Sequence, residues 1–406
     1  MISIPSPDTL QPTKHNGCYL FPSASTPLLK LDILFEAGSA YQHRPLCAAA
    51  TSKLLSVATT DIDALRLAEF LDFRGIVIET NSDIYQSALT VYMLRRFADQ
   101  ALPIVKRMIT QPAFNSDDLL TWCRKKKNEI AALEQQTPHL ARRLFYRTLF
   151  GDTHPLGRYA TPDDADRLTP DDLRRHFDQC YLHGPSAIVL SGDCESLDGM
   201  MDDIECVVDN TYHQAPPATP LPLSPLHYPL PSATQTSIRI GRILPLRWDD
   251  PDYADLTLLT TLLGGYFGSR LMSNLREDKG YTYGIYARTQ IYRGCIVFYI
   301  TADIAAGAAD SARNEIVREL RRLADEPIPD DELDLVKTVL AADFVRSVDG
   351  IFERSARFCD MFATGVTELF TANLAHSLQY TTPSQLRHLA RRLLSPDQMV
   401  FCSAGL

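Results

Sequence analysis

The chain has 406 residues, of which 45% are hydrophobic and 22% are charged, and this composition is typical of globular proteins. It excludes a disordered chain, a collagen-like chain and a small disulfide-stapled domain. At roughly 100 to 200 residues per domain, the length predicts two to four domains, and two is the simplest expectation. The formal net charge of −10 argues against a dedicated nucleic-acid-binding protein, because such a protein needs a basic surface to displace counterions from phosphates.

The sequence carries no recognisable signal for export or for insertion into a membrane. No basic segment followed by an apolar stretch comes after Met1, and no run of about 18 apolar residues occurs. The nine cysteines are scattered, form no Cys-x-x-Cys pair and are odd in number, which argues against a disulfide framework. We therefore expect a cytoplasmic protein with reduced thiols and no membrane partner.

In chain order, the first half predicts strands that pair locally and are interleaved with helices. Alternating apolar residues predict a strand over Leu31–Phe35, and helical periodicity predicts a helix over Leu46–Val57. β-Branched and aromatic residues predict a hairpin over Gly75–Met93, and Phe97–Ile109 again has apolar residues at helical spacing. Asn115 is expected to cap the next helix, whose first turn is acidic. This order is typical of an α+β layered architecture.

The sequence repeats itself at a fixed offset. Thr169-Pro-Asp-Asp-Leu173 resembles Thr382-Pro-Ser-Gln-Leu386, and each segment leads through an apolar run to a glycine. That glycine is Gly192 in the first copy and Gly405 in the second. The threonines that begin the two copies and the glycines that end them are therefore separated by the same number of residues, 213. Similar segments at one constant spacing are the signature of an internal repeat.

Two further pairs of segments keep the same order along the chain. Ser116-Asp-Asp-Leu-Leu120 and Pro329-Asp-Asp-Glu-Leu333 are related by the same step, and both open a helical segment. Leu71–Gly75 and Leu275–Gly280 both precede a β-rich stretch, at a slightly different offset that a change in loop length explains. The sequence therefore predicts a duplication into two homologous α+β domains, each a mainly antiparallel sheet packed with helices.

A proline-rich segment separates the two copies. Seven prolines occur between Ala215 and Pro231, a density that neither a helix nor a central strand accommodates. Such a segment favours extended geometry and acts as a semi-rigid spacer. We therefore predict domains at residues 1–213 and 235–406, joined by a linker at residues 214–234.

The common nucleotide-binding and hydrolytic motifs are missing. Gly264-Gly-Tyr-Phe-Gly268 is followed by no Lys-Ser/Thr pair, so we interpret this glycine cluster as a helix interruption and turn rather than a phosphate-binding loop. No Gly-x-Ser-x-Gly motif of a serine hydrolase is present. The basic run Arg124–Lys127 lies between Trp122 and Glu129, and we interpret it as the solvated face of a helix rather than a nucleic-acid site.

The spacing of the histidines gives no zinc motif. A zinc-binding helix places two His side chains one turn apart, whereas the two closest here, His176 and His183, are seven residues apart. Cys180 lies between them, but Gly184-Pro185 follows at once, so we expect the helix to end before His183. We therefore interpret these residues as ordinary surface or half-buried side chains rather than as metal ligands.

Four motifs resemble those of one known family. They are a first-strand motif at Phe35–Tyr41, a hairpin motif at Thr80–Asp83, a long-helix motif at Asn128–Ile130, and the run Leu263–Leu271 that leads to Leu275–Tyr283. On these motifs the chain resembles one polypeptide of the pitrilysin/insulinase-type zinc peptidases, in the branch that includes mitochondrial processing peptidase and its bacterial relatives. The resemblance covers nearly all of the chain and implies two homologous α+β halves.

Active members of that family carry an inverted zinc motif, His-x-x-Glu-His, on the first helix, with a further Glu as the third ligand. The matching segment here, Leu46–Leu55, contains neither His nor Glu. Two alignments that differ by one residue are possible, and neither supplies a zinc ligand or a general base. The two His positions fall on Ala49 and Lys53 or on Ala50 and Leu54, and the Glu position falls on Ser52 or Lys53.

Glu129 matches the third zinc ligand of the family. One carboxylate does not hold a zinc ion, because the ion needs three protein ligands in such a site. We therefore expect Glu129 to be a helix surface residue or a partner in a salt bridge. We also expect this chain to carry no metal and no other cofactor, with zinc in a partner subunit.

The second half keeps two residues that the family uses. In the family, an Arg and a Tyr seven residues apart reach across the chamber to the zinc-bearing half, where they bind the substrate backbone and help to stabilise the oxyanion. Arg276 and Tyr283 match this pair in identity and spacing. The chemistry suits these roles, because a guanidinium is always charged and a tyrosyl hydroxyl is a neutral donor to a developing oxyanion. Gly280, between them, lets the chain turn from a helix end into a strand.

The resemblance implies a non-metal subunit of a heterodimeric zinc metallopeptidase, inactive alone. This subunit would supply Arg276 and Tyr283 in trans, as catalytic and substrate-binding residues, to a peptidase partner of similar size that carries the zinc. The alternative is a catalytically inactive homodimeric scaffold or peptide-binding protein of the same fold, like the core subunits of the respiratory complex that resemble processing peptidase. Retention of both residues favours the first hypothesis.

Overall fold

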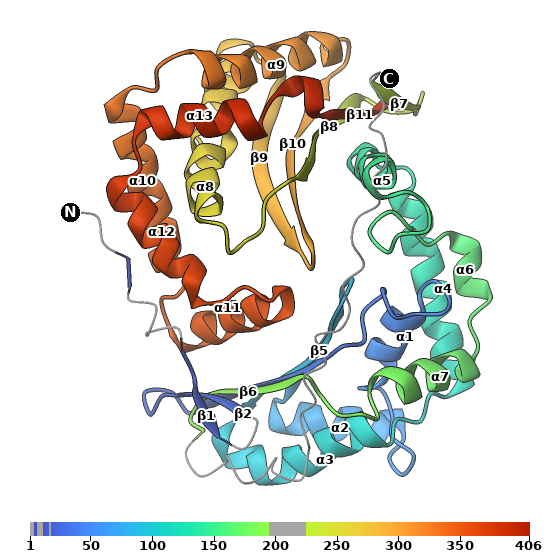
Figure 1. Cartoon of the computed structure of the whole chain (residues 1–406). Coiled ribbons are helices and arrows are strands. Elements are labelled where there is room, and N and C mark those ends of the chain that lie inside the picture. Colours follow the sequence, from blue (N-terminus) through green and yellow to red (C-terminus); the bar gives the residue numbers. More distant parts are fainter. Residues whose placement is uncertain (1–3, 6–10, 16–17, 195–224) are drawn as a thin grey trace.

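The computed structural model of the chain consists of two lobes. Figure 1 shows that the lobes face each other and that each is built around a sheet with helices packed against it. We call the part up to residue 194 the first lobe and the part from residue 225 the second lobe. The structure describes residues 4–5, 11–15, 18–194 and 225–406.

The first lobe contains a six-stranded sheet. Its strands are β1 (Thr13–His15), β2 (Cys18–Pro22), β3 (Leu28–Phe35), β4 (Val77–Ser82), β5 (Ser87–Leu94) and β6 (Ala187–Gly192). The order across the sheet is β1-β2-β6-β3-β5-β4, and all pairs are antiparallel except β2 with β6. The predicted strand over Leu31–Phe35 is the end of β3, and the predicted hairpin is β4 with β5.

The second lobe contains a five-stranded sheet in the order β7-β11-β8-β10-β9. Its strands are β7 (Leu226–Pro229), β8 (Gln235–Leu244), β9 (Thr282–Tyr292), β10 (Cys295–Ala305) and β11 (Val400–Gly405). β7 lies in the last part of the expected linker at residues 214–234, of which residues 214–224 lie outside the described residues. β7 is an edge strand, which is the place in a sheet where proline is tolerated.

The two sheets have the same topology, which confirms the duplication that the sequence predicts. The series β2-β6-β3-β5-β4 corresponds strand for strand to β7-β11-β8-β10-β9, and in both sheets the first pair is parallel. α7 (Pro170–Cys180) and α13 (Pro383–Leu393) keep the offset of the sequence repeat, and a threonine capping box, at Thr169 or Thr382, starts each of them. The α+β class with two homologous units is therefore correct.

The first lobe has helices on the side of its sheet that faces away from the second lobe (Figure 1). The helix predicted over Leu46–Val57 is shorter than expected, because the chain leaves the helix after Leu54 and the Val57 N–H closes a turn onto the Leu54 carbonyl. The first-lobe helices besides α7 are α1 (Cys47–Leu54), α2 (Ala64–Arg74), α3 (Ala98–Thr110), α4 (Ser116–Leu133), α5 (Thr137–Phe150) and α6 (Pro162–Asp166).

Asn115 occupies the cap position before α4, but its side chain does not cap the helix. Its amide nitrogen instead donates a hydrogen bond to a carboxylate oxygen of Asp118, at 3.1 Å. The predicted role of Asn115 was therefore wrong. The acidic first turn, with Asp117 and Asp118, still interacts favourably with the positive end of the helix dipole.

The second-lobe helices follow the same plan, and α8 is buried on nearly every side, by the sheet and by neighbouring helices. No helix in the part of the chain that the structure describes is long and apolar enough to cross a membrane. Besides α13, the helices are α8 (Pro251–Gly264), α9 (Ala309–Asp325), α10 (Asp330–Arg346), α11 (Ile351–Thr364) and α12 (Glu368–Tyr380), and Met272–Asp278 form a π-helical segment.

Two equivalent helices are exchanged between the lobes. α5 belongs to the first half of the sequence but packs against β8 and β11 of the second sheet, whereas α11 packs against β2 and β6 of the first sheet. The ring of Phe358 on α11 lies 4.8 Å from that of Tyr19 on β2, centroid to centroid. α5 follows α4 along the chain just as α11 follows α10, so the two helices hold the same place in the duplication. Each sheet therefore depends on the other lobe for part of its cover.

Candidate functional site

Arg276 and Tyr283 lie side by side at the start of β9. Arg276 is in the π-helical segment, Gly280 adopts a φ of +64°, and the chain then enters β9 at Thr282. This left-handed turn at glycine brings the two side chains onto one surface. The Arg276 guanidinium lies 5.1 Å from the Tyr283 ring centroid and 4.3 Å from that of Phe267. The structure therefore brings together the two residues that the sequence singled out.

The pair lies on the molecular surface. Tyr283 is 90% exposed, and Phe267 is also exposed, so the Arg276 guanidinium is stacked between two accessible rings. The Arg276 Nε lies 3.4 Å from a carboxylate oxygen of Glu277. An open pocket of about 410 Å³ adjoins Tyr283 and is lined by Tyr281, Thr282, Gly284, Tyr286 and Asp303, among others. This arrangement offers a cation and a phenolic donor to a ligand that approaches from outside.

The strand that carries Tyr283 is an edge strand. β9 pairs with β10 on one side, and no strand among the described residues pairs with its other side. An exposed edge presents backbone N–H and C=O groups that can pair with an extended peptide. Near Tyr283, the Ile285 N–H already donates to the Met272 sulfur at 3.4 Å, so the π-helical segment covers this part of the edge.

On α1, the structure distinguishes between the two alignments of the degenerate zinc motif. Ala50 and Leu54 are buried in the core of the first lobe, whereas Ala49 is partly exposed and Lys53 is exposed. A catalytic metal must be reachable by substrate, so the first alignment, with the His positions on Ala49 and Lys53, agrees better with the fold. The Glu position then falls on Ser52, whose hydroxyl donates a hydrogen bond to the Asn81 carbonyl at 3.1 Å.

These side chains do not fit a zinc ion. A methyl group, a hydroxyl that is already hydrogen-bonded and a lysine ammonium replace two imidazoles and a carboxylate, and an ammonium repels a cation. Glu129 on α4 is exposed and forms an ion pair with Lys126, at 3.0 Å, as the sequence predicted for an isolated carboxylate. Within the described ranges, no group of three or more His, Cys, Asp and Glu side chains could hold a metal ion.

The His176 and Cys180 side chains contact each other inside the first lobe. His176 is buried, its Nε2 lies 3.0 Å from the Ala37 carbonyl oxygen, and its Nδ1 lies 3.7 Å from the Cys180 sulfur. α7 ends at Cys180, so His183 is exposed on the following turn, as predicted. The cluster is therefore a satisfied histidine of the core beside a thiol.

The glycine cluster and the basic run also have structural roles. α8 ends at Gly264 and the chain turns at once, as predicted. A Cβ at Gly264 would lie 2.5 Å from the backbone nitrogen of Ala287, so only glycine allows α8 to approach β9 this closely.

The basic run Arg124–Lys127 lies on α4, where Lys127 forms an ion pair with Asp166 on α6. It is the solvated helix face that the sequence predicted.

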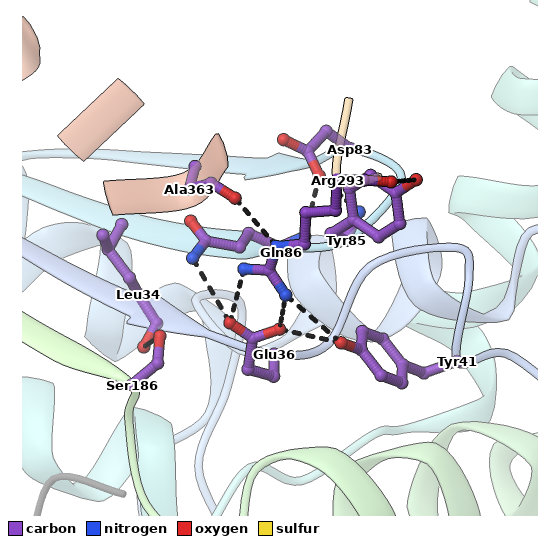
Figure 2. A network of polar contacts seen from close by, with 9 residues as sticks. All are labelled: Leu34, Glu36, Tyr41, Asp83, Tyr85, Gln86, Ser186, Arg293 and Ala363. Atoms are coloured by element: carbon purple, nitrogen blue, oxygen red, sulfur yellow. Dashed lines mark hydrogen bonds and ion pairs between the residues drawn. The ribbon is translucent and has the colours of Figure 1, made fainter. Parts of the chain in front are cut away.

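An ion pair between the lobes, from Arg293 to Glu36, was not predicted from the sequence. Figure 2 shows Arg293, in the turn between β9 and β10, directed at Glu36, which follows β3. The Glu36 carboxylate also accepts a hydrogen bond from the Tyr41 hydroxyl at 2.8 Å, and the Arg293 Nε donates to the Ala363 carbonyl at 2.9 Å. Glu36 lies within the first-strand motif at Phe35–Tyr41, but no residue near it in the sequence indicates that its partner is Arg293.

Comparison with known proteins adds independent information. The family model described as "Peptidase M16 inactive domain" matches residues 167–340. The chain is 23% identical over 246 residues to the "Non-peptidase homolog YmxG" of Helicobacter pylori, covering 59% of this chain and 56% of that protein. It is 22% identical over 354 residues to the "Uncharacterized zinc protease YmxG" of Bacillus subtilis, covering 84% and 83% of the two chains.

An "uncharacterized zinc protease" of Streptomyces coelicolor is 26% identical over 257 residues, which cover 57% of this chain and 53% of that protein. The chain thus spans only a little over half the length of the Helicobacter and Streptomyces relatives. Among solved structures, the M16 inactive domain from Pseudomonas fluorescens has a TM-score of 0.82 and 21% identity and covers 97% of each chain. A chain of complex III2 from Candida albicans has a TM-score of 0.75 and 12% identity, over 98% of this chain and 96% of that one.

The duplicated α+β lobes and the degenerate helix α1 thus define a protein of the M16 peptidase fold without the usual zinc ligands. The match to the M16 inactive-domain model, the YmxG relatives and the structural neighbour together support a non-catalytic member of the peptidase M16 family, and α1 lacks the His-x-x-Glu-His motif.

Proposed function

We propose that this chain is the non-metal subunit of a heterodimeric zinc metallopeptidase and supplies Arg276 and Tyr283 in trans. The observation that carries the proposal is the accessibility of the pair, since Tyr283 is 90% exposed and stands beside a guanidinium held between two rings. Tyr283 and Phe267 are both exposed beside Arg276, and a group of exposed aromatic side chains is the kind of surface that contacts a ligand or a partner. The partner subunit would carry the zinc ion and the general base.

Each of the two side chains has a task that its chemistry allows. The Arg276 guanidinium would donate hydrogen bonds to carbonyl oxygens of the peptide, and its stacking on Phe267 would limit the conformations it must give up on binding. The Tyr283 hydroxyl would donate to the oxygen on which negative charge develops. The open pocket beside Tyr283 supports the proposal, because part of a peptide could enter it next to the phenolic hydroxyl.

The test requires a partner from the same source. The chain should co-purify with a protein of similar size that bears His-x-x-Glu-His, and peptide cleavage should appear only when both are present. In that mixture, Tyr283→Phe should lower kcat by roughly 10²- to 10³-fold, because it removes one donor to the oxyanion. Tyr380→Phe, at an exposed tyrosine on α12, is the matched control and should leave kcat unchanged. Unchanged turnover of the Tyr283→Phe mixture would refute the proposed role.

The second candidate is a catalytically inactive homodimeric scaffold or peptide-binding protein. The name "Non-peptidase homolog" of the Helicobacter relative favours it, because that relative is described as having no peptidase activity. Under this hypothesis the purified chain would sediment as a dimer of itself, and the source would contain no partner with the zinc motif. We propose the cytoplasm as the location in either case, since no disulfide joins the cysteines of the described residues.

A further inference from the structure

A second pocket lies where the two lobes meet, away from Arg276 and Tyr283. It has a volume of about 330 Å³, and both lobes contribute to it. The first lobe provides α5, the segment that follows α5 and the turn between β4 and β5; the second lobe provides the end of β9 and the end of α11. We call it the junction pocket. Its polar lining includes Tyr85, Arg142, Tyr146, Arg158, Tyr159 and Tyr292.

Two arginines of the junction pocket have no acidic partner. On α5, Arg143 forms an ion pair with Glu134 at 3.2 Å, and Arg147 forms one with Asp152. Arg142, on the same helix, lines the pocket, and its guanidinium lies 5.8 Å from the Tyr146 ring centroid. Arg158 also lines the pocket, and no carboxylate in the described part of the chain pairs with either Arg142 or Arg158.

The tyrosines of the pocket add hydroxyl donors. The Tyr292 hydroxyl donates to the Tyr146 hydroxyl at 2.9 Å, so the Tyr146 proton remains available for another acceptor. The Tyr159 hydroxyl also lines the pocket and makes no hydrogen bond among the described residues. Burial raises the pKa of both Tyr146 and Tyr159, which keeps these hydroxyls protonated and therefore able to donate.

The surroundings of the pocket increase its positive potential. The Arg239 guanidinium lies behind Tyr146, 5.9 Å from its ring centroid and 4.5 Å from that of Tyr299, and it has no carboxylate partner within the described ranges. Asp83 is an acidic residue of the lining, and one of its oxygens accepts hydrogen bonds from the backbone N–H groups of Tyr85 and Gln86, both at 2.7 Å. Donors with positive charge therefore exceed acceptors in the pocket.

We propose that the junction pocket binds a carboxylate group of a peptide segment. Arg142 and Arg158 are exposed at this pocket, so their donors and those of two tyrosines are available to an acceptor with negative charge, and the planar guanidinium matches a carboxylate in a bidentate way. The apolar side chains of Ile84, Leu156 and Ile291 also line the pocket and would contact the carbon chain that carries the carboxylate. Because both lobes form this site and the zinc partner does not, the proposal does not depend on catalysis.

The test measures binding of defined probes to the full chain. The probe is a fluorescein-labelled peptide Gly-Gly-Glu-Glu with a free C-terminus, and its affinity is compared with that of Gly-Gly-Gln-Gln amide at low salt by fluorescence anisotropy. We expect the acidic peptide to bind and the neutral peptide to bind at least about tenfold more weakly, because hydrogen bonds to charged groups are among the stronger ones. Equal affinities for the two peptides would overturn the proposal.

Substitutions in the junction pocket show whether the acidic peptide binds there. Arg142→Gln and Arg158→Gln should each weaken binding of the acidic peptide by about 10- to 100-fold, and Tyr159→Phe should weaken it by a smaller factor. Arg175→Gln is the matched control, because Arg175 is an exposed arginine of α7 outside the pocket. Unfolding curves of each variant show whether it is folded. Unchanged affinity of the folded Arg142→Gln and Arg158→Gln variants, or tighter binding of inorganic phosphate than of the peptide, would refute the assignment.

Discussion

Glu36 of the first lobe and Arg293 of the second lobe form a bidentate ion pair that joins the two halves of the chain (Figure 2). The Nη2 of Arg293 donates to one carboxylate oxygen of Glu36 at 2.7 Å, and Nη1 donates to the other. Arg293 is only 9% exposed, and its guanidinium lies 5.4 Å from the centroid of the Tyr85 ring. Because this ion pair is largely shielded from water and contains two hydrogen bonds, it holds one lobe against the other.

Removing one partner of this pair should destabilise the chain strongly. Arg293→Met would leave the Glu36 carboxylate, whose side chain is 15% exposed, without its cationic partner, although Tyr41 and Gln86 would still donate hydrogen bonds to it. Breaking a buried ion pair in this way costs about 3–5 kcal/mol. The free energy of unfolding, measured by urea denaturation, should fall by that amount.

The double variant provides the control for charge. Glu36→Gln together with Arg293→Met leaves no isolated charge, so it should cost less than the sum of the two single variants. Arg174→Gln breaks the exposed pair with Asp171 and should cost less than about 1 kcal/mol. If Arg293→Met costs no more than Arg174→Gln, the ion pair does not hold the lobes together.

The exchanged helix α5 should also contribute to the stability of the second lobe. Phe145 is completely buried among side chains of both lobes, including Val297 of β10 and Val400 of β11. Phe145→Ala removes a whole ring from this cluster and should lower the free energy of unfolding by about 3–5 kcal/mol. Phe73→Ala, at a ring that is 86% exposed on α2, should cost little. Similar losses in both variants would contradict the role of α5 as a buried bridge.

The features that sequence predicts best in this chain are those set by local patterns. The hairpin of β4 and β5 follows from alternating β-branched residues, and the capping boxes at Thr169 and Thr382 follow from Thr-Pro and an acceptor three residues later. The proximity of Arg276 and Tyr283 also follows from local geometry, because a helical segment, a left-handed glycine and a strand start lie between them.

Contacts between distant segments could not be predicted in the same way. Glu36 and Arg293 are far apart in the sequence, and neither the strand that precedes Glu36 nor the turn that holds Arg293 indicates a partner. The periodicity of α5 predicts a buried face, but it does not say which sheet covers that face. The choice between the two alignments on α1 similarly required the burial of Ala50 and Leu54 to be known.

Acidification should destabilise the chain through His176. Burial lowers the pKa of this imidazole, and the hydrogen bond to the Ala37 carbonyl opposes the shift without cancelling it. The folded chain therefore keeps His176 neutral at pH values where the unfolded chain, with a pKa of about 6.5, binds a proton. Because the unfolded state then binds more protons, the free energy of unfolding should fall as the pH drops below about 6.5.

The variant His176→Gln tests the source of this pH dependence. Glutamine keeps an N–H donor for the Ala37 carbonyl but does not titrate, so the variant should lose less stability than the wild type between pH 7 and pH 5. One histidine contributes at most about 1.4 kcal/mol per pH unit to the difference. His183→Gln, on the exposed turn after α7, is the matched control. Equal slopes for the wild type and His176→Gln would show that His176 is not the titrating group.

The absence of zinc ligands on α1 leads to a prediction about metal content. The purified wild-type chain should contain well under one equivalent of zinc by elemental analysis, and EDTA should not change its Tm, because Ala49, Ser52 and Lys53 offer no imidazole. Ala49→His with Lys53→His would place two imidazoles one helical turn apart, on the accessible side of α1. This double variant should bind zinc.

The helix that carries Glu129, α4, packs against α1, so Glu129 is the residue expected to complete this engineered site. Adding Glu129→Gln to the double variant should therefore weaken zinc binding, measured by isothermal titration calorimetry, because an amide oxygen is a poorer ligand for the ion than a carboxylate. Glu134→Gln, at the C-terminal end of α4, is the matched control and should leave the affinity unchanged. A tight one-to-one zinc site in the wild-type chain would contradict our interpretation of α1, since no side chain at its motif positions could supply the ligands.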